Sequence, residues 1–461
     1  MRTSHTPKLP LRLCLTLALL LLAPALATAQ TTTAPPGDAL ALTGVTVIDG
    51  TGGPPRPRMT VLVRGGRIAG LFRTGRKRLP AGTTELSLPG HFVIPGLIDA
   101  HYHLLLNRGE PEETLRRRFA FYGGVTTVRD MAGDAVKLAE VARAGVDPGT
   151  PEPRVYYSAV LAGPTWFSDE RVKLMMHDRP AGQAPWARAV TDDSNVVQVI
   201  TEAKATGATG IKMYADLSPA LVARLSREAH RQGLKVWSHL AIFPSRPGDA
   251  IAARVDAVSH AVDFVWELVE KMPAQFKDAS YRTIDWTHMR PDAPAITKLL
   301  GRMKRQGTIL DATVLVTHDR IAERQRALPE KERTIKDPDA LDAWLFGVTR
   351  RAYGAGVRVT AGTDIQEAPR RQEMPNIHTE MELLVTRAGL TPLAALTAAT
   401  RNGALALGVA RDYGTISPGK VADLVVLSAD PSHDIRNTTK VVYIIKGGRV
   451  HRRERVVMPE N

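Results

Sequence analysis

The sequence predicts an α/β protein: a (β/α)8 barrel, together with a β-sandwich domain assembled from both chain ends. Three observations carry this prediction. Strand-like segments alternate with helix-like segments through the middle of the chain, from about residue 95 to residue 408. Short runs of alternating apolar and polar residues precede that middle and return after it. The chain of 461 residues, 44% of them hydrophobic, is long enough to bury both cores.

The first 29 residues have the three parts of a secretory signal peptide. A basic start, a mostly apolar run and a small-residue cleavage site follow one another at residues 1–12, 13–22 and 27–29. The apolar run is shorter than the ~20 residues that span a bilayer. We therefore expect export to the periplasm or the medium, with no membrane attachment after cleavage. Residues 30–37 are expected to form a flexible leader. The single cysteine, Cys14, lies in the signal segment, so the mature protein should form no disulfide.

The two ends of the mature chain share one pattern. Strand-like alternation between Gly, Pro and Asp turns occupies residues 38–94 and 409–461. Each segment contains a Gly-Gly pair, Gly65-Gly66 and Gly447-Gly448, of the kind that forms tight hairpin turns. We therefore expect these segments to build one β-sandwich on either side of the barrel sequence at residues 95–408.

The barrel sequence contains eight apolar strand candidates with helix-like segments between them. The strand candidates are residues 92–103, 124–131, 154–162, 210–216, 235–240, 257–263, 308–316 and 358–364. The helix after the fourth strand has clear start and stop signals. Ser218 is its predicted N-cap, Pro219 occupies its first position, and Gly233 follows as the stop signal of the helix. Eight such units are typical of a TIM barrel, although doubly wound sheets show the same alternation.

His101 and His103 end the first strand candidate, in the sequence DAHYH. Residues two apart in a strand point to the same side, so these imidazoles could share a metal ion. Lys212 lies in the apolar fourth strand, where burial favours the neutral amine. A neutral amine can add carbon dioxide to form a carbamate, which is a carboxylate able to bridge two metal ions. A lysine whose head reaches solvent at the strand end is the alternative.

Three further candidate ligands end other predicted strands: His239 the fifth, His260 the sixth and Asp364 the eighth. Each of them alone is more often a structural residue than a ligand. A barrel, however, brings the carboxyl ends of all its strands to one rim, where long strand-to-helix connections at residues 163–195 and 317–340 also lie. We therefore predict a metal centre at this rim, formed by His101, His103, Lys212, His239, His260 and Asp364.

This constellation resembles the amidohydrolase superfamily of metal-dependent hydrolases, over nearly the whole mature chain. The resemblance is carried by the stretches VIPGLIDAHYH, GVTTVRD, IKMYAD, AGTD and GTISPGKVADLVVL. GVTTVRD, IKMY and IHTEMELLVTRAGLTPLAALTAAT are similar to the imidazolonepropionase-like and prolidase-like branch, which includes exported dipeptidases that cleave Xaa-Pro, Xaa-Lys or Xaa-Arg. The stretches HLAIFP after His239 and SHAVDF around His260 depart from many relatives in the neighbours that face substrate.

The resemblance implies two divalent metal ions, zinc being the expected metal. The more buried ion would be held by His101, His103 and Asp364, the second by His239 and His260, with a carbamate on Lys212 bridging them. Hydroxide between the metals would attack a carbonyl, and Asp364 would pass the proton to the leaving amine. The implied activity is amide hydrolysis in a dipeptide or an N-acyl amino acid. A hydrolase of a cyclic amide or lactone and a non-catalytic binding protein are the alternatives.

Three other residues are candidates for contacting a small-molecule substrate. Tyr214 lies two residues after Lys212, His318 just past the seventh strand, and His378 before a helix. A packed tyrosine and ordinary loop histidines are the alternatives. Arg129 and Asp130, at the end of the second strand, are expected to take part in an ion pair that supports the barrel.

The formal net charge is +14, from 61 Lys and Arg against 47 Asp and Glu. The basic runs at residues 76–78 and 116–118 lack the interleaved aromatic residues of nucleic-acid surfaces, and aromatics make up only 5% of the chain. No phosphate loop or dinucleotide fingerprint is present in the sequence. We therefore expect no nucleic-acid partner. Members of the family are often homo-oligomers.

Overall fold

The computed structural model of the chain describes Met1 and residues 39–104, 110–170, 172, 180–364 and 374–457. The expected signal peptide, apart from Met1, and the leader lie outside these residues. Residues 36–461 belong to one compact unit. Among the described residues, no helix combines the length and the apolar character needed to cross a membrane.

Eight parallel strands form the barrel, one in each of the eight segments that the sequence predicts. They are β6 (Leu97–Tyr102), β7 (Val125–Asp130), β8 (Arg154–Ala162), β11 (Gly210–Met213), β12 (Lys235–His239), β13 (Ala257–Ser259), β14 (Ile309–Asp311) and β15 (Val359–Thr360). Neighbours pair in this order from β6 to β15. Backbone hydrogen bonds from Ala100 N to Ala361 O (3.0 Å) and from Asp364 N to His101 O (2.9 Å) bring the last strand back to the first. The barrel prediction is confirmed.

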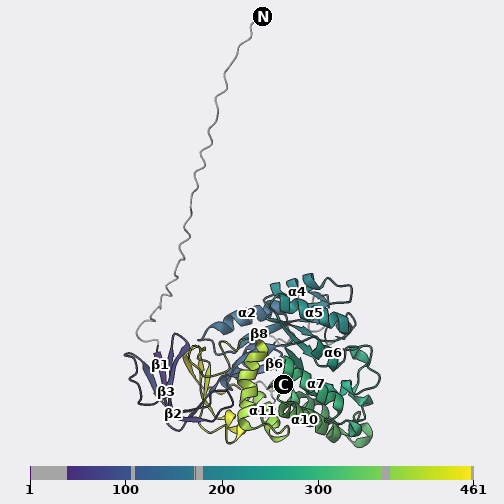
Figure 1. Cartoon of the computed structure of the whole chain (residues 1–461). Helices are drawn as coiled ribbons and strands as arrows, with labels where there is room; N and C mark the ends of the chain where they lie inside the picture. The colour runs from purple at the N-terminus through teal and green to yellow at the C-terminus, as the bar shows by residue number, and fades with distance from the viewer. Residues whose placement is uncertain (2–38, 105–109, 171, 173–179, 365–373, 458–461) are drawn as a thin grey trace. The chain divides into compact units, whose positions relative to one another are not determined.

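The helices surround these strands (Figure 1). They are α1 (Glu110–Tyr122), α2 (Ala135–Val146), α4 (Val196–Ala205), α5 (Pro219–Arg231), α6 (Pro247–Ala252), α7 (Pro294–Gln306), α10 (Pro338–Gly354), α11 (Ile377–Thr386), α12 (Pro392–Thr397), the π-helical η8 (Ala398–Asn402) and α13 (Gly403–Leu407). Helix α5 follows its sequence signals closely: the Ser218 hydroxyl accepts a hydrogen bond from Leu221 N at 3.1 Å. Its buried face of Leu221, Leu225 and Ala229 packs into the barrel core.

Strands from the two chain ends form a second sheet, with the order β18-β17-β16-β5-β1-β2-β3 and β4 beside β1. These strands are β1 (Ala39–Val47), β2 (Arg56–Arg64), β3 (Arg67–Arg73), β4 (Thr84–Ser87), β5 (Phe92–Pro95), β16 (Leu424–Leu427), β17 (Val441–Lys446) and β18 (Arg449–Arg452). The antiparallel pairing of β5 with β16 joins the two ends, so the purple and yellow strands lie together in Figure 1. Both Gly-Gly pairs have positive φ and form the hairpin turns, as a turn with two left-handed residues requires.

The predicted first barrel strand, residues 92–103, is divided in the structure, which corrects that prediction. Phe92–Pro95 pairs in the second sheet, and the barrel strand begins at Leu97. Gly96 lies between them, and a side chain at this position would overlap with Thr126 of β7. The chain therefore passes from one sheet to the other at a residue that has no side chain.

A buried ion pair joins the barrel to the second sheet. The Arg154 guanidinium, at the start of β8, donates to Asp423 at 2.8 Å, and Asp423 also accepts the backbone N–H of Gly447 at 2.6 Å. Nearby, the buried Lys446 ammonium donates to the carbonyls of Thr150 and Glu152. These bonds satisfy charges that burial would otherwise penalise, and they hold the two sheets in one unit.

Long connections follow three barrel strands on the side of the predicted metal site. They contain η1 (Trp166–Ser168), β9 (Gln183–Ala184) and β10 (Ala187–Ala189) after β8, and η2 (Ala261–Glu267), η3 (Phe276–Asp278), η4 (Tyr281–Thr283) and η5 (Trp286–His288) after β13. After β14 they contain α8 (Val314–Thr317), the π-helical η6 (His318–Glu323), α9 (Arg324–Arg326) and η7 (Glu330–Glu332). A further short helix, η9 (Ile435–Thr439), precedes β17. The connection after β13 is one that the sequence analysis did not single out.

Candidate metal centre and its pocket

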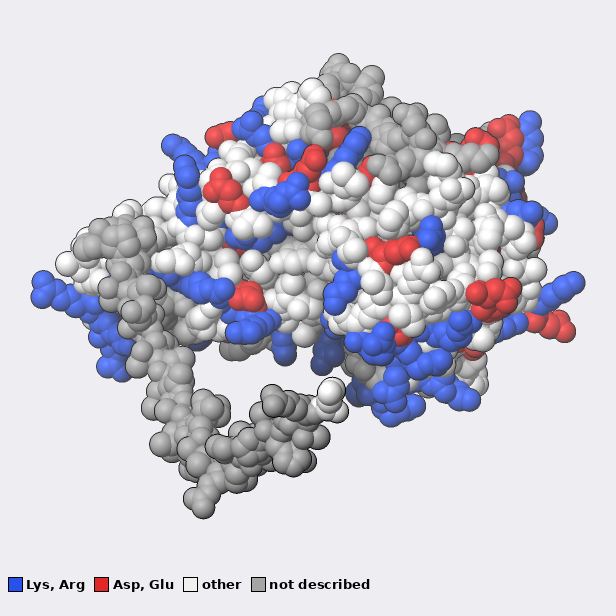
Figure 2. Space-filling view, turned by 90° about the horizontal axis from the view of Figure 1, so that it is seen from above, with Lys and Arg blue, Asp and Glu red and all other residues white. Residues whose placement is uncertain are grey.

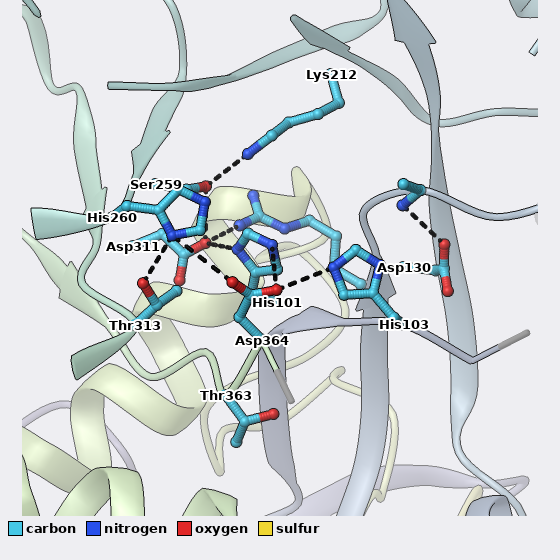
Figure 3. A network of polar contacts seen from close by, with 12 residues as sticks. His101, His103, Asp130, Lys212, Ser259, His260, Asp311, Thr313, Thr363 and Asp364 are labelled. Carbon is cyan, nitrogen blue, oxygen red and sulfur yellow. Dashed lines mark hydrogen bonds and ion pairs between the residues drawn. The ribbon is translucent and has the colours of Figure 1, made fainter. Parts of the chain in front are cut away.

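The six predicted ligands lie at the carboxyl ends of the strands that carry them. His101 is in β6 and His103 directly follows it, Lys212 is in β11, and His239 is the last residue of β12. His260 follows β13, and Asp364 lies four residues after β15. Figure 3 shows His101, His103, Lys212, His260 and Asp364 around one space.

Asp364 is the residue on which three of the imidazoles converge. One of its carboxylate oxygens, Oδ1, lies 3.0 Å from His103 Nε2 and 3.4 Å from His101 Nε2, and Oδ2 lies 3.7 Å from His260 Nδ1. His101, His260 and Asp364 each offer a ligand atom within 4.8 Å of the others. The neighbouring imidazoles outweigh the effect of burial and hold the pKa of Asp364 far below its usual range. An ionised carboxylate among imidazoles is a donor set that suits zinc.

The ring of His101 is oriented for a ligand on its inner nitrogen. It is fully buried, and its Nδ1–H donates to the Asp311 carboxylate at 2.8 Å. Its Nε2 therefore carries the free lone pair, faces Asp364, and has no hydrogen-bond partner among the described residues. A buried nitrogen without a partner is costly unless something binds it. Metal-ligating histidines typically donate their other N–H to a carboxylate in this way, so His101 fits a metal ligand.

Lys212 is fully buried beside the imidazoles. Its Nζ donates to the Ser259 hydroxyl at 2.9 Å, and Ser259 in turn donates to Asp311 at 3.1 Å. Burial lowers the pKa of Lys212 to about 7. A substantial fraction of neutral amine is therefore present near neutral pH, which is the form that adds carbon dioxide.

Asp311, at the end of β14, is a site residue that the sequence analysis missed. It accepts hydrogen bonds from His101 Nδ1, Arg129 Nη2 (3.0 Å), Ser259 and Thr360 (3.3 Å). Burial alone would raise the pKa of Asp311, but the charges of His101 and Arg129 hold it at about 2. The sequence analysis placed Asp311 inside a longer predicted strand, residues 308–316, and a carboxylate within such an apolar run was the signal that could have found it.

The ion pair expected at the end of β7 forms between Arg129 and Asp311. Arg129 is fully buried, also donates to Ala100 O at 2.5 Å, and stacks on the Trp237 ring at 4.9 Å. Asp130 plays another part, because its carboxylate accepts the backbone N–H groups of Leu104 and Ala132. Asp130 therefore orients the chain just after His103.

His239 and His260 form the other side of the site. Their ring centroids are 4.6 Å apart, and Nδ1 of His260 lies 3.0 Å from the Thr313 hydroxyl. Burial lowers the pKa of both imidazoles, which favours the neutral form that binds metals. The ring of Tyr214 lies against His239, with centroids 4.1 Å apart. Tyr214 therefore lies beside one of the predicted ligands, and its contact with substrate stays a prediction.

The structure places the other two candidate substrate contacts elsewhere. Nδ1 of His318 lies 2.9 Å from the Asp342 carboxylate. His378 is buried, with its nitrogens 2.9 Å from Gly123 O and from the Thr438 hydroxyl. Within the described part of the chain, neither histidine lines the pocket at the metal residues.

A pocket of about 320 Å³ opens beside His239, His260 and Asp364. Most of its other lining comes from the connections after β12, β13 and β14: Phe243, Val262, Asp263, Trp266, Phe276, Ala279, Tyr281, Val316, Thr317, Arg320 and Ile321. The sequence analysis named none of these residues. A mostly apolar cavity with a few polar groups, beside candidate metal ligands, is the usual form of a small-molecule site.

The fold and the site together define a class of protein. It is an α/β-barrel with imidazoles and a carboxylate forming a candidate metal site at the carboxyl ends of its strands. Residues 346–451 match the amidohydrolase family. The chain is 26% identical over 412 residues to an imidazolonepropionase of Deinococcus deserti, covering 82% of this chain and 87% of that protein. It is 25% identical over 367 residues to the ochratoxinase of Aspergillus niger, covering 72% of this chain and 66% of that protein.

Solved structures share the fold. The ochratoxinase of A. niger has a TM-score of 0.68 at 22% identity, covering 90% of this chain and 95% of that chain. A Xaa-Pro dipeptidase with bound methionine has a TM-score of 0.67 at 21% identity, covering 90% of this chain and 100% of that chain. The family match and the imidazolonepropionase relatives support an amidohydrolase enzyme similar to the imidazolonepropionases. The solved prolidase structures share its fold.

The contact between Asp311 and His101 gives a testable prediction. Asp311→Asn removes the negative charge that orients His101 and pairs with Arg129, so metal affinity should fall about 10- to 100-fold. The measurement is the metal content of the purified protein after dialysis against a competing chelator. Asp342→Asn is the matched control, because Asp342 is also a buried carboxylate paired with a histidine and an arginine, His318 and Arg326. Equal metal retention by wild type and Asp311→Asn would contradict the assigned role.

Proposed function

We propose that this amidohydrolase is an exported, binuclear metal-dependent enzyme that hydrolyses the amide bond of a dipeptide or an N-acyl amino acid. The observation that carries the proposal is the convergence of four imidazoles, one carboxylate and one buried lysine at a single barrel rim. The unpartnered Nε2 of His101 supports metal binding in particular.

The ligand assignments follow the family resemblance. His101, His103 and Asp364 would hold the more buried metal ion, His239 and His260 the second, and a carbamate on Lys212 would join them. When bound, divalent ions such as zinc polarise the scissile carbonyl and lower the pKa of water toward ~7.

The residues of the chain itself supply positioning and proton transfer. Asp364 lines the pocket and also touches the imidazoles, so its carboxylate can take the proton of the attacking water and deliver it to the leaving amine. The buried Arg129–Asp311–His101 contacts hold the imidazole in one tautomer throughout. Tyr214, whose ring packs against that of His239 at 56°, is the candidate for contacting a substrate carbonyl.

Relatives support the choice of an amide substrate. One structural neighbour is described as a Xaa-Pro dipeptidase, an enzyme whose substrates are dipeptides. The pocket beside the metal residues has room for one amino-acid side chain and its carboxylate. Phe243 and Val262, from the stretches HLAIFP and SHAVDF that depart from many relatives, line this pocket. The pocket should therefore prefer other substrate side chains than those relatives do.

The partners and the location are part of the same proposal. On the face drawn in Figure 2, the described Lys and Arg side chains form separate groups, some with Asp or Glu beside them, and uncharged surface lies between the groups. This pattern supports a small-molecule substrate over a nucleic acid, which binds a continuous basic surface. The signal-peptide pattern of residues 1–29 supports export to the periplasm or the medium.

The direct test of the function is a substrate screen. Metal-loaded mature protein should release free amine from members of a dipeptide and N-acyl amino-acid library, and removing the metal with a chelator should stop the reaction. Asp364→Asn, which keeps the shape but cannot accept the proton, is the control for contaminating peptidases. Turnover of lactones or cyclic amides alone would contradict the proposal and favour that alternative.

Lys212 gives a second prediction. Lys212→Ala should reduce the metal content from two ions per chain to one or fewer and lower kcat/KM by more than about 100-fold, because the bridging ligand is lost. Carbon-13 NMR of protein prepared with labelled bicarbonate should show a carbamate in wild type only. Lys446→Met is the matched control, since Lys446 is also a buried lysine but donates to carbonyls of the chain before β8. A Lys212→Ala protein with two metals and full activity would disprove the bridge.

Export gives a third prediction. When the full chain is expressed in a bacterium with a periplasm, the protein recovered outside the cytoplasm should begin at or near Gln30. Mass spectrometry of the N-terminal peptide measures this. Ala29→Leu, which fills the cleavage site with a bulky side chain, should accumulate as precursor. Protein that retains its N-terminal segment from Met1 and stays in the cytoplasm would refute export.

A further inference from the structure

The pocket beside the metal residues has a continuous aromatic wall. Ring centroids are 5.1 Å apart between Phe243 and Trp266, 6.1 Å between Phe243 and Phe276, and 6.1 Å between Trp266 and Tyr281. Phe276 lies 6.5 Å from the His239 ring, so the wall reaches the metal residues. Such a wall favours a bulky apolar or aromatic group through area burial and ring packing.

Hydrogen bonds hold this wall in place. The Tyr281 hydroxyl donates to Asp263 at 2.5 Å, and the backbone N–H of Phe276 donates to Asp216 at 2.6 Å. Arg246 binds the carbonyls of Trp266 and Val269, behind the wall. The wall is therefore pre-organised, which lowers the entropic cost of binding.

Among the described residues that line the pocket, Arg320 is the one that carries a guanidinium. Val316, Thr317, Arg320 and Ile321 form one face of the helical segment after β14, and all four line the pocket. Among the described residues, Arg320 makes no hydrogen bond or ion pair. Of the nearby acids, Glu323 pairs with Arg326, and Asp263 on the pocket wall accepts the Tyr281 hydroxyl. The adjacent Asp319 acts on Arg320 through its charge alone. A guanidinium whose donors are not taken up by hydrogen bonds or ion pairs is suited to bind a carboxylate in two-point geometry.

We propose that this pocket binds the carboxyl-terminal residue of the substrate, with its α-carboxylate on Arg320 and an aromatic or large apolar side chain against Phe243, Trp266, Phe276 and Tyr281. The inference rests on the proposed function and sharpens it. In a dipeptide or an N-acyl amino acid, only the residue on the amine side of the scissile bond carries a free carboxylate. The leaving group is therefore an aromatic or bulky apolar amino acid, and Arg320 excludes amidated and longer chains.

A binding experiment tests the pocket without catalysis. The probe is 3-phenylpropanoate, which has a ring and a carboxylate but no scissile bond, and 3-phenylpropanamide is its neutral analogue. Calorimetry with the metal-loaded wild-type protein should detect binding of 3-phenylpropanoate and much weaker binding of 3-phenylpropanamide. Arg320→Met should weaken binding of the acid about 10- to 100-fold, the range expected for a charge-assisted contact. Arg324→Met is the matched control, because Arg324 is exposed on the same helical segment and does not line the pocket.

A kinetic experiment then tests the substrate class. Wild type should hydrolyse N-acetylphenylalanine with a higher kcat/KM than N-acetylalanine and N-acetylphenylalaninamide. Arg320→Met should lower kcat/KM for N-acetylphenylalanine at least tenfold. The kcat/KM for N-acetylphenylalaninamide should stay within about twofold of the wild-type value. Phe276→Ala should reduce the preference for phenylalanine over alanine, while its circular dichroism and metal content stay those of wild type.

The outcomes separate the two proposals. Unchanged binding of 3-phenylpropanoate by Arg320→Met would show that the carboxylate is held elsewhere, for example by the metals, and would overturn the assignment to Arg320. No binding by wild type would overturn the pocket as a whole. Binding that depends on Arg320, together with no release of amine from any substrate, would support the pocket's anion site and reject amide hydrolysis.

Discussion

The candidate metal-binding rim depends on one buried carboxylate, that of Asp311. A carboxylate inside a barrel is stable only when enough donors surround it, because burial favours its neutral form. Here the donors come from His101 on β6, Arg129 on β7, Ser259 on β13 and Thr360 on β15. One side chain thus ties its own strand, β14, to four others and also sets the tautomer of a predicted metal ligand.

The same carboxylate links the rim to Lys212 through the Ser259 hydroxyl. The lysine, the histidine and the arginine therefore belong to one buried network of hydrogen bonds centred on Asp311. Networks of this kind are rigid, since losing one member leaves charges unpaired in a low dielectric. Rigidity is what a metal centre requires of its ligands, because their separation determines the distance between the ions.

The connections after the strands complete the site. His260, Thr313 and Asp364 all have left-handed backbone, a costly conformation for residues with a side chain. The Glu380 carboxylate holds one of these turns by accepting the backbone N–H groups of Val314 and Leu315. The left-handed turns redirect the chain at the rim, so the strand ends present their ligands inward while the following loops build the pocket.

The sequence by itself determined the architecture, and it predicted the residues of the candidate metal centre. The eight barrel strands appear in it as apolar runs between turn signals, and the ligand types at their ends are visible without coordinates. The tertiary structure alone decided which buried acid orients His101, because Asp311 and His101 are 210 residues apart and only barrel closure brings them together. It also decided that residues 92–103 divide at Gly96, since the contact with Thr126 cannot be read from a local pattern. The pocket depends on the tertiary structure most of all: short 3-10 and π-helical turns carry no periodicity, so only packing shows that the aromatic wall and Arg320 face the metal residues.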